Sequence, residues 1–252
     1  MNDISREHFL KLLAAGGASF LGLGSVASAA DLLKGPLVPW GRLRYVGEFG
    51  DQEDWHVHPQ GDLNLLDSIR GQTSINVDKK WNIADVANLD SMTPFPFLFM
   101  HGEVAPILDD TAKANLREYF LRGGFLFAED CVNGYGHHGS NRVNDYFFRA
   151  VVDQLPSVLP GSKLERLAND HPVFHCFHHF DEMPHMQGTP HGLHALSYDG
   201  RVVALISPSD LHCGWTDGDR WFGPGMSRIA CEMGTNIYLY AMTQSTTVAG
   251  ST

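Results

Sequence analysis

Residues 95–131, FPFLFMHGEVAPILDDTAKANLREYFLRGGFLFAEDC, contain two apolar runs separated by a stretch with helical character. The runs FPFLFM and FLFAED lack the alternation of a half-exposed strand, so they predict strands buried on both faces. Between them we expect a helix over 108–124, because Asp109 or Asp110 can cap its first turn and a glycine pair can end it. A strand, a helix and a second buried strand in this order are typical of a parallel sheet with helices on both faces.

The segments on either side continue this alternation. Apolar residues at helical spacing predict further helices, and β-rich runs predict further strands. The pair Asp199–Gly200 between two β-rich runs predicts a hairpin. In chain order we expect strands at 43–49 and 74–78 with a helix at 61–73 between them, a helix at 142–156, a hairpin at 193–208 and a closing helix at 227–244. The pattern predicts a single α/β domain over 30–252, built on a three-layer, doubly wound, mostly parallel sheet.

The charge balance restricts the class of partner. The 252 residues carry 18 Lys and Arg against 29 Asp and Glu, so the formal net charge is -11. An acidic chain is poorly suited to a sequence-independent grip on phosphates, and we therefore expect no nucleic-acid partner. A metal ion or another cation suits the negative electrostatic potential of an acidic chain better. An apolar content of 43% is enough for one well-buried core.

Residues 1–29 predict an export signal. A charged start, MNDISREHFLK, precedes a run of 19 uncharged residues, and Ala27 and Ala29 supply the small side chains that a signal peptidase recognises. The run is rich in Gly, Ala and Ser, which favours cleavage over retention as an anchor, so a membrane partner is expected only if the leader is retained. SREHFLK also resembles the twin-arginine signal, with Glu7 in place of the second arginine. We expect a periplasmic or other extracytoplasmic protein, exported by a Tat-like or Sec route.

The quoted stretch resembles the family known as domain of unknown function 4159. In that family a "yPf" strand, a glycine turn, a helix ending "LReYLlrGG" and a strand ending "DDC" follow in this order. The resemblance continues along the chain and covers nearly all of 42–243. It runs through NDHPVF at 169–174, FDE at 180–182, DGR at 199–201, SDL at 209–211 and GTNIYLYAMT at 234–243.

This resemblance implies a fold like that of flavodoxin and the class I glutamine amidotransferases, but it supplies no reaction. A more distant similarity, through a "GG" strand and a later "HP...DE" segment, is to the trehalose-utilisation ThuA-like proteins. That similarity implies sugar-related hydrolysis. The chain departs from the family pattern by its additional histidines, which are therefore candidate site residues.

Candidate site residues follow the two buried strands. Ligands of doubly wound sheets bind beyond the carboxyl ends of the strands. His101 and Glu103 follow the first apolar run at that edge, and Asp130 ends the second. We expect His101 and Asp130 to converge with His171, which lies in the shared NDHPVF motif. In an enzyme Asp130 or Glu103 would act as general base, whereas the alternative for an Asp at a strand end is the capping of a helix.

Further candidate ligands lie in the later loops. These are His137 and His138 after the second apolar run, and Asp210, His212 and Cys213 after the hairpin. Imidazole, carboxylate and thiolate are ligands for Zn and Cu. Cys131 lacks the Gly-x-Cys-x-Gly elbow of an amidotransferase nucleophile, so a buried or disulfide-bonded cysteine is favoured there. For the four cysteines as a set, metal ligation is the rival to one or two disulfides.

Residues 169–194, NDHPVFHCFHHFDEMPHMQGTPHGLH, contain seven of the 14 histidines. His175, His178 and His179 share one face if this segment is helical, whereas an extended segment would turn His178 to the opposite face. Together with His185 and the neighbouring methionines, they resemble the mixed ligand supply of periplasmic copper proteins. The segment predicts a metal site, with a solvated histidine surface as the alternative.

These patterns predict an exported α/β protein that binds Zn or Cu through histidine, with Asp or Cys support. As an enzyme it would be a metal-dependent hydrolase, in which metal-activated water attacks a sugar, ester or amide bond of a small-molecule or saccharide substrate. The alternative is a noncatalytic metal-carrying or assembly subunit with a protein partner in the cell envelope.

Overall fold

The computed structural model describes residues 35, 37–50, 53–132 and 145–245. The predicted export signal, as well as His137 and His138, lies outside the described residues. Within the described ranges, no helix combines the length and the apolar character that a membrane crossing needs.

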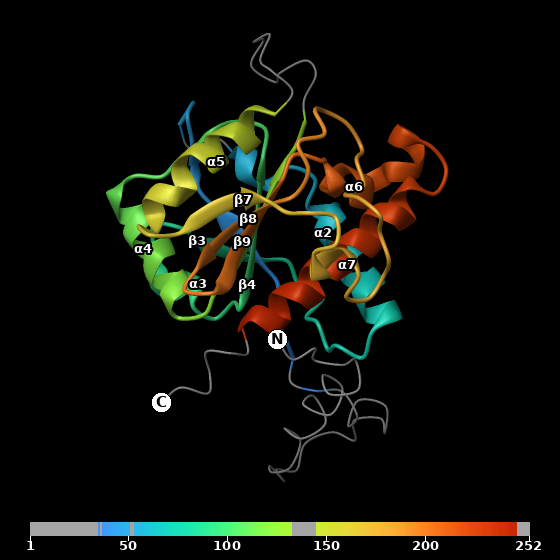
Figure 1. Ribbon diagram of the computed structural model, residues 1–252, viewed down its shortest axis with the longest axis horizontal. Helices are drawn as coiled ribbons and strands as arrows, with labels where there is room; N and C mark the ends of the chain where they lie inside the picture. The colour runs from blue at the N-terminus through green and yellow to red at the C-terminus, as the bar shows by residue number, and fades with distance from the viewer. Residues whose placement is uncertain (1–34, 36, 51–52, 133–144, 246–252) are drawn as a thin grey trace.

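A mostly parallel sheet forms the centre of the fold (Figure 1). Its strands are β1 (Gly41–Arg44), β3 (Asn82–Asp85), β4 (Phe97–Gly102), β6 (Phe125–Asp130), β7 (Lys163–Arg166), β8 (His194–Tyr198) and β9 (Arg201–Ser207). In the described part of the chain these seven strands have the order β3-β1-β4-β6-β9-β8-β7. The first five run parallel, and β8 runs antiparallel to both neighbours. The parallel strands, numbered along the chain, have the order 2-1-3-4-5 of flavodoxin-like folds.

Helices cover both faces of this sheet (Figure 1). One face carries α3 (Leu89–Met92), α4 (Asp110–Leu121) and α5 (Tyr146–Val158), and the other carries α2 (Pro59–Gln72), α6 (Leu211–Phe222) and α7 (Met226–Ser245). Strand side chains alternate between the two cores. Leu98 and Met100 of β4 pack toward α4 and α5, whereas Phe97 and Phe99 pack toward α6 and α7. The predicted three-layer, mostly parallel fold is therefore confirmed.

Most elements expected from the sequence are present. The two apolar runs form β4 and β6, in which every residue is buried, and the helix between them is α4. The expected helix at 61–73 is α2, and the hairpin turns at Asp199 and Gly200, both with positive φ. Shorter elements complete the connections. They are β2 (Val46–Gly47), which pairs with β5 (Pro106–Ile107), and the 3-10 turns η1 (Glu53–His56) and η2 (Pro172–Phe174).

The strand expected at 74–78 is wrong. Val77 forms an isolated bridge with Val38, and the strand beside β1 is β3, further along the chain. The apolar residues Ile75 and Val77 pack into the core under α2, so their alternation reflects burial without sheet pairing. Helix α6 was not predicted, because glycines inside it lower its helix propensity. In the structure, Asp217 inside this helix has non-helical backbone angles.

Asp109 is the N-cap of α4, and its carboxylate accepts a hydrogen bond from the backbone N–H of Ala112 at 2.8 Å. Asp109→Ala leaves that N–H without its partner, so the free energy of unfolding should fall by about 1 kcal/mol. Urea unfolding measures the change. Asp110→Ala, one position along at the first helical residue, is the control and should cost less, because it removes only a favourable charge near the helix dipole.

Candidate metal centre

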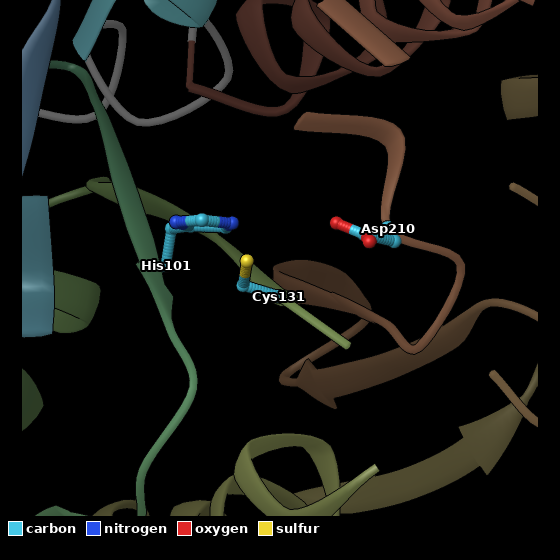
Figure 2. A group of neighbouring side chains, drawn as sticks. All are labelled: His101, Cys131 and Asp210. Carbon is cyan, nitrogen blue, oxygen red and sulfur yellow. The ribbon is translucent and has the colours of Figure 1, made fainter. Parts of the chain in front are cut away.

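A group of three metal-ligating side chains meets at the carboxyl edge of the sheet (Figure 2). His101 lies near the end of β4, Cys131 directly follows β6, and Asp210 follows β9. One potential ligand atom of each side chain lies within 4.8 Å of the other two, and all three residues are buried. Figure 2 shows the His101 ring and the Asp210 carboxylate pointing toward each other, with the sulfur of Cys131 between them.

The fold brings these residues together because their strands are neighbours. Strand β6 lies between β4 and β9, all three run parallel, and their carboxyl ends therefore share one edge. Asp210 has left-handed backbone angles, φ 55° and ψ 39°, at the start of α6. Asp tolerates this conformation better than most residues, and its energetic cost is common at functional sites. The turn directs the Asp210 carboxylate into the group.

Two ligand atoms of this group are buried without a hydrogen-bond partner in the described part of the chain. They are Nε2 of His101 and Oδ1 of Asp210. Burial of such an atom without a partner costs about 1–3 kcal/mol. A metal ion coordinated by both atoms would remove this cost. The group therefore has the donor chemistry and the unsatisfied atoms that a metal site requires.

Protonation in the group agrees with this interpretation. Burial, together with His212 and Arg42, holds the pKa of His101 well below its usual range, so the ring is neutral, as a metal ligand must be. Burial raises the pKa of Asp210 to about 6, although a hydrogen bond from Gln187 opposes the shift. A bound cation would favour the ionised carboxylate.

Cys131 lies between two further potential ligands. Its Sγ is 3.8 Å from Sγ of Cys213 and 3.6 Å from Oε1 of Glu103. The hydrogen bond with Cys213, and burial, raise the pKa of the Cys131 thiol well above its usual range. A thiol of this kind is a poor free nucleophile, but a metal ion can remove its proton. Metal ligation thus fits the environment of Cys131 better than acyl transfer.

A fully buried ion pair lies behind His101. Arg42 of β1 donates from Nε to Oδ2 of Asp62 at 3.1 Å, and its Nη2 contacts Oδ1 of the same carboxylate. Nη1 of Arg42 lies 3.4 Å from Nδ1 of His101. Burial alone would raise the pKa of Asp62, but Arg42 and His212 hold it below its usual range. The pair therefore stays charged and connects the metal group to α2.

The other strand-end residues have different roles. Asp130 lies on the face opposite His101, because Glu129 is the residue in register with His101. The Asp130 carboxylate accepts from the backbone N–H of Phe148 at 2.6 Å, so it caps the first turn of α5. Glu129 accepts from two backbone N–H groups at the start of α6. The helix cap that the sequence left open as an alternative is thus the observed contact of Asp130.

The predicted convergence of His101, Asp130 and His171 is wrong. His171 precedes η2, where its Nδ1 accepts from the N–H of Val173 at 3.3 Å and its Nε2 lies 3.5 Å from the Tyr240 hydroxyl of α7. The shared NDHPVF motif therefore anchors η2 to α7. Asp130 lies on the face of the sheet opposite His101 and is bound to α5, so the three side chains do not meet.

Between η2 and β8 the histidine-rich segment is neither a helix nor a strand. His178 Nε2 lies 2.6 Å from Oε1 of Gln72, and His185 Nε2 lies 3.0 Å from the carbonyl oxygen of Gly188. His175 and His179 contact each other at the surface. Because the segment follows an irregular path, its histidines point in several directions. Of the other predicted ligands, His212 contacts Asp62 and Cys213 contacts Cys131.

The sequence prediction placed Asp210 among the candidate groups after the hairpin and left metal ligation open for the cysteines, but it assigned neither Cys131 nor Asp210 as a ligand. It did not identify Arg42 or Asp62. Cys131 and Asp210 each follow a strand at the edge where ligands bind, and this position is the signal that could have found them. Arg42 offers no such signal. It lies two residues from the exposed Arg44 in one short strand, and only the fold distinguishes the two.

The fold and the site define this chain as a flavodoxin-like α/β protein with a buried His/Cys/Asp group able to hold a metal ion. More particularly, the chain belongs to the family described as "Domain of unknown function (DUF4159)", which matches residues 41–242. The chain is also similar to "Protein O-mannosyl-transferase 2" of Danio rerio, with 25% identity over 114 residues. That match spans 45% of this chain and 15% of the relative's own length.

Proposed function

We propose that this protein is an exported zinc-dependent hydrolase whose metal is bound by His101, Cys131 and Asp210. The observation that carries the proposal is the meeting of three buried ligand side chains, two of which also have a buried atom without a hydrogen-bond partner, Nε2 of His101 and Oδ1 of Asp210. No other arrangement of ligands in the described ranges brings three such side chains together. The acidic chain and the predicted leader support a cation-binding protein that acts outside the cytoplasm.

The choice of zinc over copper follows from the ligand set. One imidazole, one thiolate and one carboxylate suit Zn²⁺, which accepts nitrogen, sulfur and oxygen ligands in one tetrahedral site. Copper in its reduced state prefers thiolate and thioether ligands, and a carboxylate suits it poorly. The site also lies at the edge of the sheet where doubly wound folds bind their ligands.

Hydrolysis requires a metal with an open coordination position and a nearby base. Three protein ligands leave one tetrahedral position for water, which the metal would activate. Glu103 is the better candidate for the base, because it lies 3.6 Å from Cys131 Sγ and is partly exposed. Asp130 is already bound to the first turn of α5, which makes it a poorer candidate. The substrate class is a sugar, ester or amide bond in a small molecule or saccharide.

One observation favours a second candidate, a noncatalytic metal-carrying or assembly subunit of an envelope complex. Cys213 Sγ lies 3.8 Å from Cys131 Sγ. Two thiolates on one tetrahedral zinc, each at about 2.3 Å, would be separated by about the same distance. Cys213 would then complete four protein ligands, and closed sites of this kind are typical of structural zinc.

Elemental analysis of the full-length protein tests the proposal, with an expected content of one zinc per chain at the buried centre. Cys213→Ser separates the two candidates. In the hydrolase the variant should bind zinc with an affinity close to that of the wild type, because three ligands remain. In the closed site it should lose at least about tenfold in affinity, as loss of a ligand exceeds the loss of an outer-shell partner. A wild-type chain that binds no zinc after reconstitution would falsify both candidates.

A further inference from the structure

We infer that His175 and His179 form a second metal site, at the surface and separate from the buried centre. Nδ1 of His175 lies 3.0 Å from Nδ1 of His179. The two ring centroids are 4.6 Å apart. Both residues are exposed, so a metal ion can reach the pair directly from solvent. The site would take a divalent transition metal such as Zn²⁺, with water as the remaining ligands.

The hydrogen positions support a cation between the rings. Nε2 of His175 lies 2.9 Å from the carbonyl oxygen of Asn169, and Nε2 of His179 lies 3.4 Å from Oδ1 of Asp181. The Asn169 carbonyl oxygen can only accept, so the His175 ring donates from Nε2 and has its lone pair on Nδ1. The Asp181 carboxylate beside Nε2 of His179 favours the same tautomer in the second ring. In that tautomer two lone pairs face each other, and a cation bound between the two Nδ1 atoms would stabilise them. This arrangement matches the metal-ligating histidine whose second nitrogen donates to an oxygen.

The distance between the two nitrogens is close to that of a bound metal. Two imidazoles on one tetrahedral zinc, each at 2.0–2.1 Å, have nitrogens about 3.3 Å apart. The observed separation is therefore a few tenths of an ångström too short. Because both side chains are exposed, small rotations about their side-chain bonds can supply this difference without a change in the core.

The backbone around the pair is held in place, which keeps the two rings together. The N–H of Phe180 donates to the carbonyl oxygen of Phe174 at 2.9 Å and closes the loop that contains both histidines. The buried Asn236 of α7 accepts from the N–H of His178 at 2.8 Å and donates to its carbonyl oxygen at 2.8 Å. A loop fixed at both points has less conformational entropy to lose when a metal binds.

Neighbouring side chains do not extend the site into a thiolate centre. Cys176 lies between the two histidines in the chain, but its Sγ contacts the carbonyl oxygen of Asn236 at 3.3 Å. Its thiol therefore points toward α7 and away from the imidazole pair. The ligands are two imidazoles and water, so the surface site should bind zinc more weakly than the buried centre, whose ligands include a thiolate.

Calorimetric titration of the full chain with Zn²⁺ tests this inference. We expect the wild type to bind one more equivalent than the variant His175→Ala/His179→Ala. The matched control is His178→Ala, from the same loop, which should keep the wild-type number of equivalents because its ring contacts Gln72 instead. His179→Gln, which keeps a polar side chain but removes the imidazole lone pair, should lose the same equivalent as the double variant.

Equal numbers of zinc equivalents in the wild type and in both histidine variants would overturn the second site, and the pair would then share only a proton. The buried centre is tested separately, because Cys131→Ser should remove its equivalent and leave the surface equivalent in place. Circular dichroism of each variant checks the fold, which the exposed histidine substitutions on an irregular loop should not change.

Discussion

Asp62→Ala is expected to lower the free energy of unfolding by about 3–5 kcal/mol, because it leaves a charged guanidinium buried without its counterion. Both side chains of the Arg42–Asp62 pair are fully buried. The carboxylate also accepts from the indole N–H groups of Trp40 at 2.8 Å and Trp81 at 3.1 Å. The substitution therefore leaves several buried donors unpaired at once. Chemical denaturation of the full chain measures the loss.

A double variant separates the charge from the packing. Arg42→Met/Asp62→Leu removes both charges and fills much of the same volume with apolar groups. Replacement of a buried ion pair in this way is often neutral or stabilising by about 1–4 kcal/mol. The indole donors still lose their acceptor, so we expect the double variant to be more stable than Asp62→Ala but no more stable than the wild type. A double variant as unstable as Asp62→Ala would show that the unpaired charge is not the cause.

The matched control lies on the same strand. Arg44 pairs with Asp85, and the two side chains are 49% and 27% exposed. Solvent screens this pair, so Arg44→Ala should cost at most about 1 kcal/mol. A loss as large as that of Asp62→Ala would contradict the argument that burial determines the effect.

The contrast between these two arginines also shows which features the sequence predicts. The apolar runs of β4 and β6 are readable because a strand buried on both faces needs nearly every residue to be apolar. The α4 cap is readable because the Asp109 hydrogen bond is local. Arg42 pairs with Asp62 on α2. This partner is distant in the sequence, so the residues of β1 alone do not predict the ion pair.

The candidate site was partly predictable for the same reason. Chain order and the rule for strand ends located the correct edge of the sheet, and His101 lies there as expected. The face on which a side chain points depends on register. Glu129 and Asp130 are adjacent in the strand, so Glu129 points to the same face as His101 and Asp130 points to the opposite face, toward α5. Without that register, the two adjacent acids could not be distinguished.

The histidine-rich segment did not predict the buried metal site, because composition does not determine where the histidine side chains point. A helix or a strand would place its histidines on defined faces, but most of the segment is irregular and is held by hydrogen bonds to distant residues such as Asn236. A loop of this kind has no periodicity from which shared faces can be predicted. The contact between His175 and His179 arises from a loop closure that only the fold reveals.

Zinc is expected to produce the second large effect, a rise in thermal stability that depends on Cys131. A ligand that binds only the folded state, at a free concentration 1,000 times its dissociation constant, adds about 4 kcal/mol to the free energy of unfolding. For a chain of this size that corresponds to roughly 8–16 °C in the unfolding midpoint. Differential scanning calorimetry of the full chain, with zinc and with a chelator, measures the shift.

Three variants identify the source of that rise. Cys131→Ala should abolish most of it, since the variant lacks the thiolate ligand, whereas Cys176→Ala should keep it because that thiol faces α7. His175→Ala/His179→Ala should also keep most of it, because a weaker surface site adds little at the same zinc concentration. A rise that survives Cys131→Ala and disappears in the histidine variant would assign zinc stabilisation to the surface pair and remove the support for the buried centre.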